Sequence, residues 1–212
     1  MNRPSDDTAT PDAPRRARGR PRKTDDERDD GNRRQALLQA AARLFRQQGF
    51  AATSTRDIAT AAGMRSGSPF YHFENKEALL AGVMREGMQS ALRRQAAAMD
   101  SAVAAGAMNG RALGARDCLR VLVRSHFEVL LGPDSDFIPV MLYEWRSLSE
   151  AQRSEVNRLK ADYEAAWVPV LRALHASGEL KGEPGLARLM LFGALNWSVQ
   201  WFDPDRQASL DD

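Results

Sequence analysis

The chain has 212 residues, 43% of them apolar, which is enough to bury a sizeable hydrophobic core. Its longest weakly polar run, residues 189–202, contains Asn196 and Gln200 and is too short to cross a bilayer, and the arginine-rich N-terminus contains no apolar signal core. A single cysteine excludes an internal disulfide, and three dispersed histidines give no metal-ligand spacing. We therefore expect a cytoplasmic protein without a membrane span, a metal or a cofactor.

Charge is distributed unevenly along the chain. Residues 1–74 carry 14 Lys/Arg against 10 Asp/Glu, whereas residues 75–212 carry 16 against 18. This asymmetry indicates a basic module that meets a polyanion such as nucleic acid, joined to a neutral or acidic module.

Residues 1–30 contain almost no large apolar side chain, so we expect them to form a disordered basic tail. Within this tail, the sequence Arg18-Gly19-Arg20-Pro21 resembles the core of an AT-hook, in which arginines enter the narrow minor groove of A·T-rich DNA. Two interpretations are open, namely minor-groove binding through Arg18 and Arg20 or a solubilising tail.

The first amphipathic pattern begins at Arg33. Apolar residues then recur at helical spacing on one face, at Leu37, Leu38, Ala41, Leu44 and Phe45. Gly49 follows them and is the expected end of this helix.

A helix-turn-helix is expected next. Ser54 can cap a second helix, and Asp57 stands three residues later, where it completes a capping-box arrangement. Gly63 ends this helix with the residue type that best adopts the left-handed conformation, and a third short helix opens near Ser66. Two short helices around a glycine turn form the motif.

The remaining sequence predicts further helices and no strands. Asn75 is a good N-cap for a helix that fades before the Ala/Gly-rich residues 102–114, which we expect to form a loop. Pro184 suits a first helical turn, whereas Pro169 should interrupt its helix. The further helical patterns cover Asp117 to Leu131, Asp136 to Arg146, Glu150 to Ser177 and Pro184 to Phe202. The fold class is therefore all-α.

Short motifs follow one another in a dense series before residue 80. They are Ala36-Leu37-Leu38, Leu44-Phe45, Gly49-Phe50, Thr53-Ser54-Thr55-Arg56-Asp57-Ile58-Ala59, Ala62-Gly63-Met64, Gly67-Ser68-Pro69-Phe70-Tyr71-His72-Phe73 and Asn75-Lys76-Glu77-Ala78-Leu79. This series resembles the TetR family of bacterial regulators. The resemblance implies a three-helix DNA-binding domain over residues 31–76 and a helical effector-binding and dimerisation domain over residues 77–212.

The resemblance also implies which residues meet double-stranded DNA. The second helix of the motif lies in the major groove, where Arg65 at its start can donate two hydrogen bonds to guanine and Gly67 lets the backbone approach. Thr55 and Lys76 match positions that contact phosphates in the family, and helix N-termini attract anions. The expected DNA-contacting residues are Thr55, Arg56, Arg65, Ser66, Gly67, Ser68, Tyr71, His72 and Lys76.

Three positions in this region weaken a direct transfer of contacts. Phe70 stands where the family usually has a tyrosine, so its phosphate contact is lost or moves to Tyr71. Pro69 stands where a leucine or isoleucine is common in the family; if Ser66 caps the third helix, Pro69 is its third residue and an assignment of base contacts shifted by one residue is open. His72 either donates to a phosphate or packs at the junction of two helices, and packing is favoured.

The C-terminal part combines aromatic and polar residues. All four tryptophans lie there, and helical spacing of aromatic residues is typical of core as well as of ligand pockets. The family resemblance implies a cavity for a small apolar or acyl-type effector. The candidate ligand-binding residues are His126, Phe127, Glu144, Trp145, Asn196 and Trp197.

The last two long helical patterns match in position the helices that form the dimer interface in the family. A stripe with small residues at its centre consists of Leu186, Leu189, Met190, Gly193, Ala194 and Trp197. We therefore expect a homodimeric repressor that binds a palindromic operator and is released by its effector. A transcriptional activator and an architectural DNA-binding protein remain alternatives. No catalytic constellation stands out, and Cys118 is most simply a packing residue.

Overall fold

The computed structural model describes residues 25–64, 69–132 and 135–203. The α-helices are α1 (Asp25–Ala52), α2 (Thr55–Ala61), α3 (Pro69–His72), α4 (Lys76–Met108), α5 (Ala115–Leu131), α6 (Phe137–Glu144), α7 (Glu150–Ala165), α8 (Trp167–Ala176) and α9 (Pro184–Trp197). Two 3-10 turns, η1 (Trp145–Ser147) and η2 (Ser198–Gln200), extend α6 and α9. These described residues contain no strand, which confirms the all-α prediction.

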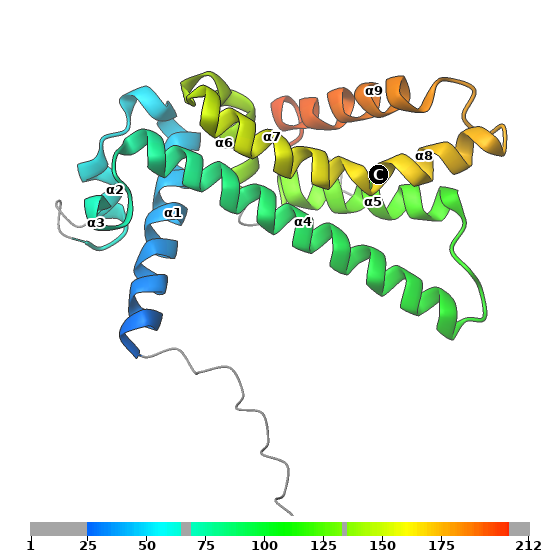
Figure 1. Cartoon of the computed structure of the whole chain (residues 1–212), viewed down its shortest axis with the longest axis horizontal. Coiled ribbons are helices and arrows are strands. Elements are labelled where there is room, and N and C mark those ends of the chain that lie inside the picture. Colours follow the sequence, from blue (N-terminus) through cyan, green and yellow to red (C-terminus); the bar gives the residue numbers. More distant parts are fainter. Residues whose placement is uncertain (1–24, 65–68, 133–134, 204–212) are drawn as a thin grey trace, which may run out of the picture.

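The molecule is elongated, with a small lobe at one end. Figure 1 shows α1, α2 and α3 gathered at that end, while α4 runs from the lobe along the length of the remaining helices. The helices beyond α4 form a bundle that continues away from the lobe. Among the described helices, none is long and apolar enough to cross a membrane.

Helix α1 begins at Asp25, earlier than the expected start near Arg33. The tail predicted for residues 1–30 was therefore too long at its C-terminal end. That prediction rested on the lack of apolar side chains, but a helix nucleated by the apolar face of residues 37–45 propagates through polar residues at little cost. Gly49 leaves the helical conformation, with φ 81° and ψ 162°, as the sequence predicted for that position.

Local capping signals fix the two helices that follow. The Ser54 hydroxyl accepts a hydrogen bond from the Asp57 amide at 3.1 Å, and the Asp57 carboxylate accepts one from the Ser54 amide at 3.0 Å. The Ser54 hydroxyl also donates to the Asp57 carboxylate at 2.6 Å, and this bond together with the bond from the Ser54 amide lowers the pKa of Asp57 below its ordinary value. Gly63 has a φ of 69°, so the predicted capping box and glycine turn are both confirmed. The described part of α3 begins at Pro69. A proline in the first turn of a helix costs no backbone hydrogen bond, because the amides of that turn have no acceptor within the helix.

Helix α4 continues to Met108, so the loop predicted for residues 102–114 was largely wrong. Alanine is the strongest helix former, and the Ala-rich composition favours helix over loop. The chain turns only at Gly110, whose φ is 65°. Gly106 permits that return, because a Cβ there would lie 2.7 Å from the Arg111 carbonyl oxygen.

The later helices agree closely with the predicted patterns. Helix α5 covers the first pattern, α6 with η1 covers the second, and α9 with η2 covers the last. The third pattern divides into α7 and α8 at Ala166, and Pro169 lies in the first turn of α8. The interruption predicted from Pro169 is therefore confirmed, and Pro184 stands at the first position of α9.

One hydrophobic core joins the small lobe to the bundle. It includes Leu37 and Phe45 of α1, Leu80 and Met84 of α4, and Ile138 of α6. Helix α1 therefore packs against both α4 and α6. Because interiors are close-packed, the lobe cannot change its position without a repacking of these helices.

Asn75 caps the start of α4, the helix that joins the lobe to the bundle, and its contribution to stability can be tested. Its side chain accepts a hydrogen bond from the Ala78 amide at 2.7 Å and thereby caps α4. We expect Asn75→Ala to lower the free energy of unfolding by about 1 kcal/mol, measured by urea titration. Asn75→Asp retains an acceptor and should stay close to the original value. Equal stability of the alanine variant and the original protein would contradict this role.

Candidate DNA-binding face and ligand cavity

The surface of the small lobe exposes several of the predicted DNA-contacting residues. The Tyr71 side chain is 81% exposed, and Arg56 is exposed in the first turn of α2, beside the half-buried Thr55. His72 differs, because its side chain is only 5% exposed and its Nδ1 lies 3.7 Å from the Asp30 carboxylate. Tyr71 and Arg56 are thus available to a partner, whereas His72, at the end of α3, packs against α1.

Lys76 holds the link between α1 and α2. Its Nζ donates to the carbonyl oxygens of Phe50 at 2.9 Å and Thr53 at 3.0 Å, and it lies 4.3 Å from the centre of the Phe50 ring. Two of the three N–H donors of an ammonium are therefore used inside the lobe. The predicted phosphate contact of Lys76 stays a prediction.

Six other predicted contact residues lie outside the described part of the chain. They are Arg18, Arg20, Arg65, Ser66, Gly67 and Ser68. Their roles stay predictions from the motif.

A cavity of about 170 Å³ lies within the bundle. Helices α4, α5, α6, α7 and α9 contribute the lining residues Met88, Ala91, His126, Val129, Ile138, Met141, Lys160, Tyr163, Glu164, Phe192, Gly193 and Asn196. Most of this lining is apolar, and a few polar groups converge on it. An apolar cavity with a small number of placed polar groups is typical of a small-molecule site.

A buried hydrogen-bonded chain crosses one wall of the cavity. His126 Nδ1 lies 3.0 Å from the Tyr163 hydroxyl, and His126 Nε2 lies 3.2 Å from the Asn196 side-chain oxygen. Burial lowers the pKa of His126 to about 4, against the opposing effect of the Asn196 hydrogen bond, and burial raises the pKa of Tyr163. The ring is therefore neutral at pH 7. Nε2–H donates to Asn196, and Nδ1 accepts from the tyrosine hydroxyl.

Trp167 of α8 packs behind this wall of the cavity. Its indole N–H donates to the Gln95 side-chain oxygen at 2.9 Å, and the Gln95 amide donates to the Tyr163 carbonyl at 3.0 Å. The ring centre of Trp167 also lies 4.8 Å from that of Phe192, which lines the cavity. These contacts fix the position of α7 relative to α4 and α8.

Two charged residues of α7, Glu164 and Lys160, line the cavity and have different partners. Glu164 forms an ion pair with Arg188 of α9. Lys160 is half-buried, and its Nζ lies 5.2 Å from the centre of the Trp145 ring. Burial lowers the pKa of Lys160 below its ordinary value.

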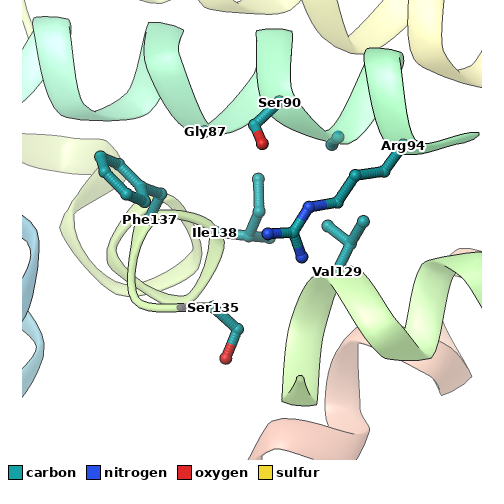
Figure 2. Close-up of a pocket in the computed structure, with 8 residues that line it drawn as sticks. Gly87, Ser90, Arg94, Val129, Ser135, Phe137 and Ile138 are labelled. Carbon is teal, nitrogen blue, oxygen red and sulfur yellow. The ribbon is translucent and has the colours of Figure 1, made fainter. Parts of the chain in front are cut away.

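A smaller pocket of about 20 Å³ adjoins the cavity (Figure 2). Ala91, Val129 and Ile138 line both spaces. Figure 2 shows the Arg94 guanidinium reaching across toward Ile138 and Val129. Because this pocket holds little more than one water, the larger cavity is the candidate ligand site.

Comparison with known proteins places the chain in a family. Residues 37–83 match the model described as bacterial regulatory proteins, tetR family, and residues 112–212 match the tetracyclin repressor-like C-terminal domain. The chain belongs to the TetR family. It is therefore a DNA-binding transcriptional regulator and not an enzyme.

Individual TetR-family relatives and structural neighbours cover most of the chain. The HTH-type transcriptional repressor KstR2 of Rhodococcus jostii is 29% identical over 196 residues, 90% of each chain. The crystal structure of superantigen PfiT is 34% identical, with a TM-score of 0.69 over 84% of this chain and 90% of that one. The structure of AibR with isovaleryl coenzyme A and operator DNA has the same fold, with 23% identity and a TM-score of 0.69 over 84% of this chain and 92% of AibR.

The cavity contains two of the six predicted ligand-binding residues, His126 and Asn196. Phe127 packs at the edge of the smaller core cluster, and the Trp197 side chain is 65% exposed, so neither lines this cavity. Trp145 lies against Lys160 and does not line the cavity itself. Their ligand contacts stay predictions without support from this geometry.

Glu144 lies away from the cavity and joins the bundle to the lobe. Its Oε1 accepts a hydrogen bond from the Phe50 amide at 2.9 Å, across 94 residues of sequence. The same helix, α6, contributes Ile138 and Met141 to the cavity. Arg46 of α1 also pairs with Asp136, which precedes α6, at 2.8 Å. Helix α6 therefore contacts both the cavity and the DNA-binding lobe.

Lys160, Tyr163 and Phe192 line the cavity but are not among the ligand-binding residues predicted from the sequence. The spacing of Lys160, Tyr163 and Glu164 places them on one helical face, but this signal is weak in a helix as polar as α7. A buried tyrosine between two charged residues is the only local indication that this face points inward.

Buried neutral His126 predicts a dependence of stability on pH. As the pH falls from 6.5 toward 4, the unfolded chain binds a proton at this residue and the folded chain does not, so folded-state stability is lost. The loss amounts to as much as about 3 kcal/mol across this window. We expect urea titrations at and below pH 6.5 to show it.

The matched variants are His126→Gln and His175→Gln. The first should remove most of this pH dependence, whereas the second changes an exposed histidine and should retain it. A pH dependence that persists unchanged in His126→Gln would contradict the assignment.

Proposed function

We propose that this TetR-family chain is a homodimeric repressor of a palindromic operator, released when a small molecule fills the cavity among α4, α5, α6, α7 and α9. The observation that carries the proposal is the double contact of α6, with the cavity on one side and with Phe50 through Glu144 on the other. A ligand that displaces Ile138 or Met141 acts on the same helix that orients the lobe.

The homodimer is supported by an unusually exposed apolar face on α9. The side chains of Leu186, Leu189, Met190 and Trp197 are 57–68% exposed. Beside them, α5, α8 and α9 border a hollow of about 550 Å³, whose lining is apolar apart from Arg116 and Glu179. A contiguous apolar surface of this kind marks an interaction site. Helix-turn-helix dimers read half-sites about 34–36 Å apart, and a second copy related by a two-fold axis would supply the second reading helix that this requires.

The switch requires unequal ligand affinity for two arrangements of the lobe. A ligand with equal affinity for both would shift nothing. In the arrangement described here, α1 is tied to α6 by the Arg46–Asp136 ion pair and by the Glu144 hydrogen bond. We propose that an occupied cavity favours an arrangement in which α6 has moved and these ties are altered.

The effector is proposed to be a small apolar or acyl-type molecule. The apolar lining of the cavity supports an apolar body, and the methionines Met88 and Met141 adapt readily to different shapes. AibR, a structural neighbour, was solved with isovaleryl coenzyme A, which is consistent with an acyl-type effector.

Operator recognition is tested by two arginine variants. We expect Arg65→Ala to lose about 1–3 kcal/mol of discrimination at one base pair, since it removes a bidentate contact to guanine. Arg56→Ala should weaken binding to all sequences and reduce the salt dependence by about one counterion. The measurement is fluorescence anisotropy on a selected operator and on a scrambled duplex.

The control for these variants is Arg158→Ala, an exposed arginine near the middle of α7, outside the DNA-binding motif. It should change neither quantity. An equal loss by Arg65→Ala on selected and scrambled DNA would contradict base reading, and protection of DNA without any preferred sequence would contradict the operator itself.

The coupling is tested at Glu144. We expect Glu144→Ala to reduce the ligand-induced loss of operator affinity about fivefold, because one hydrogen bond contributes about 1 kcal/mol. Operator affinity is measured with and without short-, medium- and long-chain acyl-coenzyme A. Glu155→Ala is the matched control, since Glu155 pairs with Arg85 within the bundle. Equal ligand responses in both variants would contradict transmission through Glu144.

A further inference from the structure

We propose that the ligand of the cavity carries a negatively charged group and that Lys160 of α7 binds this group. The proposal deepens the effector-binding function and rests on it only in requiring that the cavity binds a ligand. The ligand class is an amphipathic anion, with a small apolar body and one charged end.

The charges around the cavity do not balance without a ligand. The ionisable residues of the lining are His126, Lys160, Tyr163 and Glu164. His126 is neutral at pH 7 because its pKa is about 4, and burial keeps the Tyr163 hydroxyl protonated. Glu164 is paired with Arg188. One positive charge, that of Lys160, is therefore left without a compensating charge.

Lys160 has no polar partner among the described residues, although one is near in sequence. A lysine commonly pairs with a glutamate four residues away on the same helix. Here Glu164 is taken by Arg188 of α9, and the Lys160 ammonium lies over the Trp145 ring at 5.2 Å. An aromatic face attracts a cation but supplies less than a carboxylate or phosphate oxygen does. The half-buried ammonium is thus poised for an anionic partner.

The rest of the cavity limits the size and character of the ligand. Its volume of about 170 Å³ is close to that of a cavity that holds benzene, ~150 Å³. Met88, Ile138, Met141 and Phe192 form the apolar surface around it. An apolar chain or ring of medium size fits this space, with its charged end at Lys160.

Arg94 offers a matched control cation. Of the two adjoining spaces it lines only the smaller pocket, its side chain is exposed, and Figure 2 shows its guanidinium beside Val129 and Ile138. An anion attracted by general positive charge would respond to Arg94 as well as to Lys160. An anion bound in the cavity would respond to Lys160 alone.

The test compares octanoate with 1-octanol, which share a chain and differ in charge. Binding to the full-length protein is followed by tryptophan fluorescence and by calorimetry, in the absence of DNA. We expect octanoate to bind at least about tenfold more tightly than octanol, as hydrogen bonds to charged groups allow. Lys160→Gln should weaken octanoate binding about tenfold and leave octanol unchanged. Lys160→Arg should retain the preference, and Arg94→Gln should alter neither affinity.

The proposal is overturned if octanol binds the original protein as tightly as octanoate, if neither binds, or if the preference survives in a folded Lys160→Gln protein. Circular dichroism and the melting temperature establish that the variants are folded. Operator binding is measured separately, so a failure of DNA recognition or release is distinguishable from a failure of anion recognition.

Discussion

The packing of α1 against α4 and α6 is the contact on which the rest of the structure depends. Two glycines of α4 permit it. A Cβ at Gly82 would lie 2.8 Å from the Phe73 ring and 3.1 Å from the Leu38 side chain of α1, and one at Gly87 would lie 2.7 Å from the Phe137 Cβ of α6. The small lobe and the start of α6 therefore approach α4 more closely than any side chain would allow. Close-packed contacts of this kind switch between discrete arrangements and do not deform gradually.

This packing explains why residues of the DNA-binding motif have internal roles. Lys76 donates to the carbonyls of Phe50 and Thr53, and the Glu144 carboxylate accepts from the Phe50 amide. The same short link, between α1 and α2, is thus held from α4 and from α6. A residue of the motif can therefore contact other parts of the lobe as well as DNA. His72, packed near Asp30, is a second example.

Local signals predicted most of the fold, because they act within a few residues. The Ser54–Asp57 capping box, the Asn75 cap, the left-handed Gly63 and the break at Pro169 each depend on neighbouring backbone groups. The error at residues 102–114 arose where composition was used in place of such a signal. The cavity was only partly predictable, since Lys160 and Tyr163 are brought to His126 by packing among α5, α7 and α9. The Glu144 contact spans 94 residues, and no local pattern encodes it.

Helix α9 connects the two proposed interactions of the bundle. Phe192, Gly193 and Asn196 line the cavity, whereas Met190 and Trp197 are largely exposed on the same helix. Few α9 residues are fully buried within the described chain, so the helix gains much of its burial from whatever covers its exposed face. In the proposed dimer, the α9 helix of the partner subunit covers this face. The Asn196–His126 hydrogen bond and the Glu164–Arg188 ion pair then tie a helix of the dimer interface to the cavity wall. In this proposal, a ligand that replaced either contact would change the support of α9, so α9 would connect the filling of the cavity to the dimer interface, while α6 connects it to the lobe.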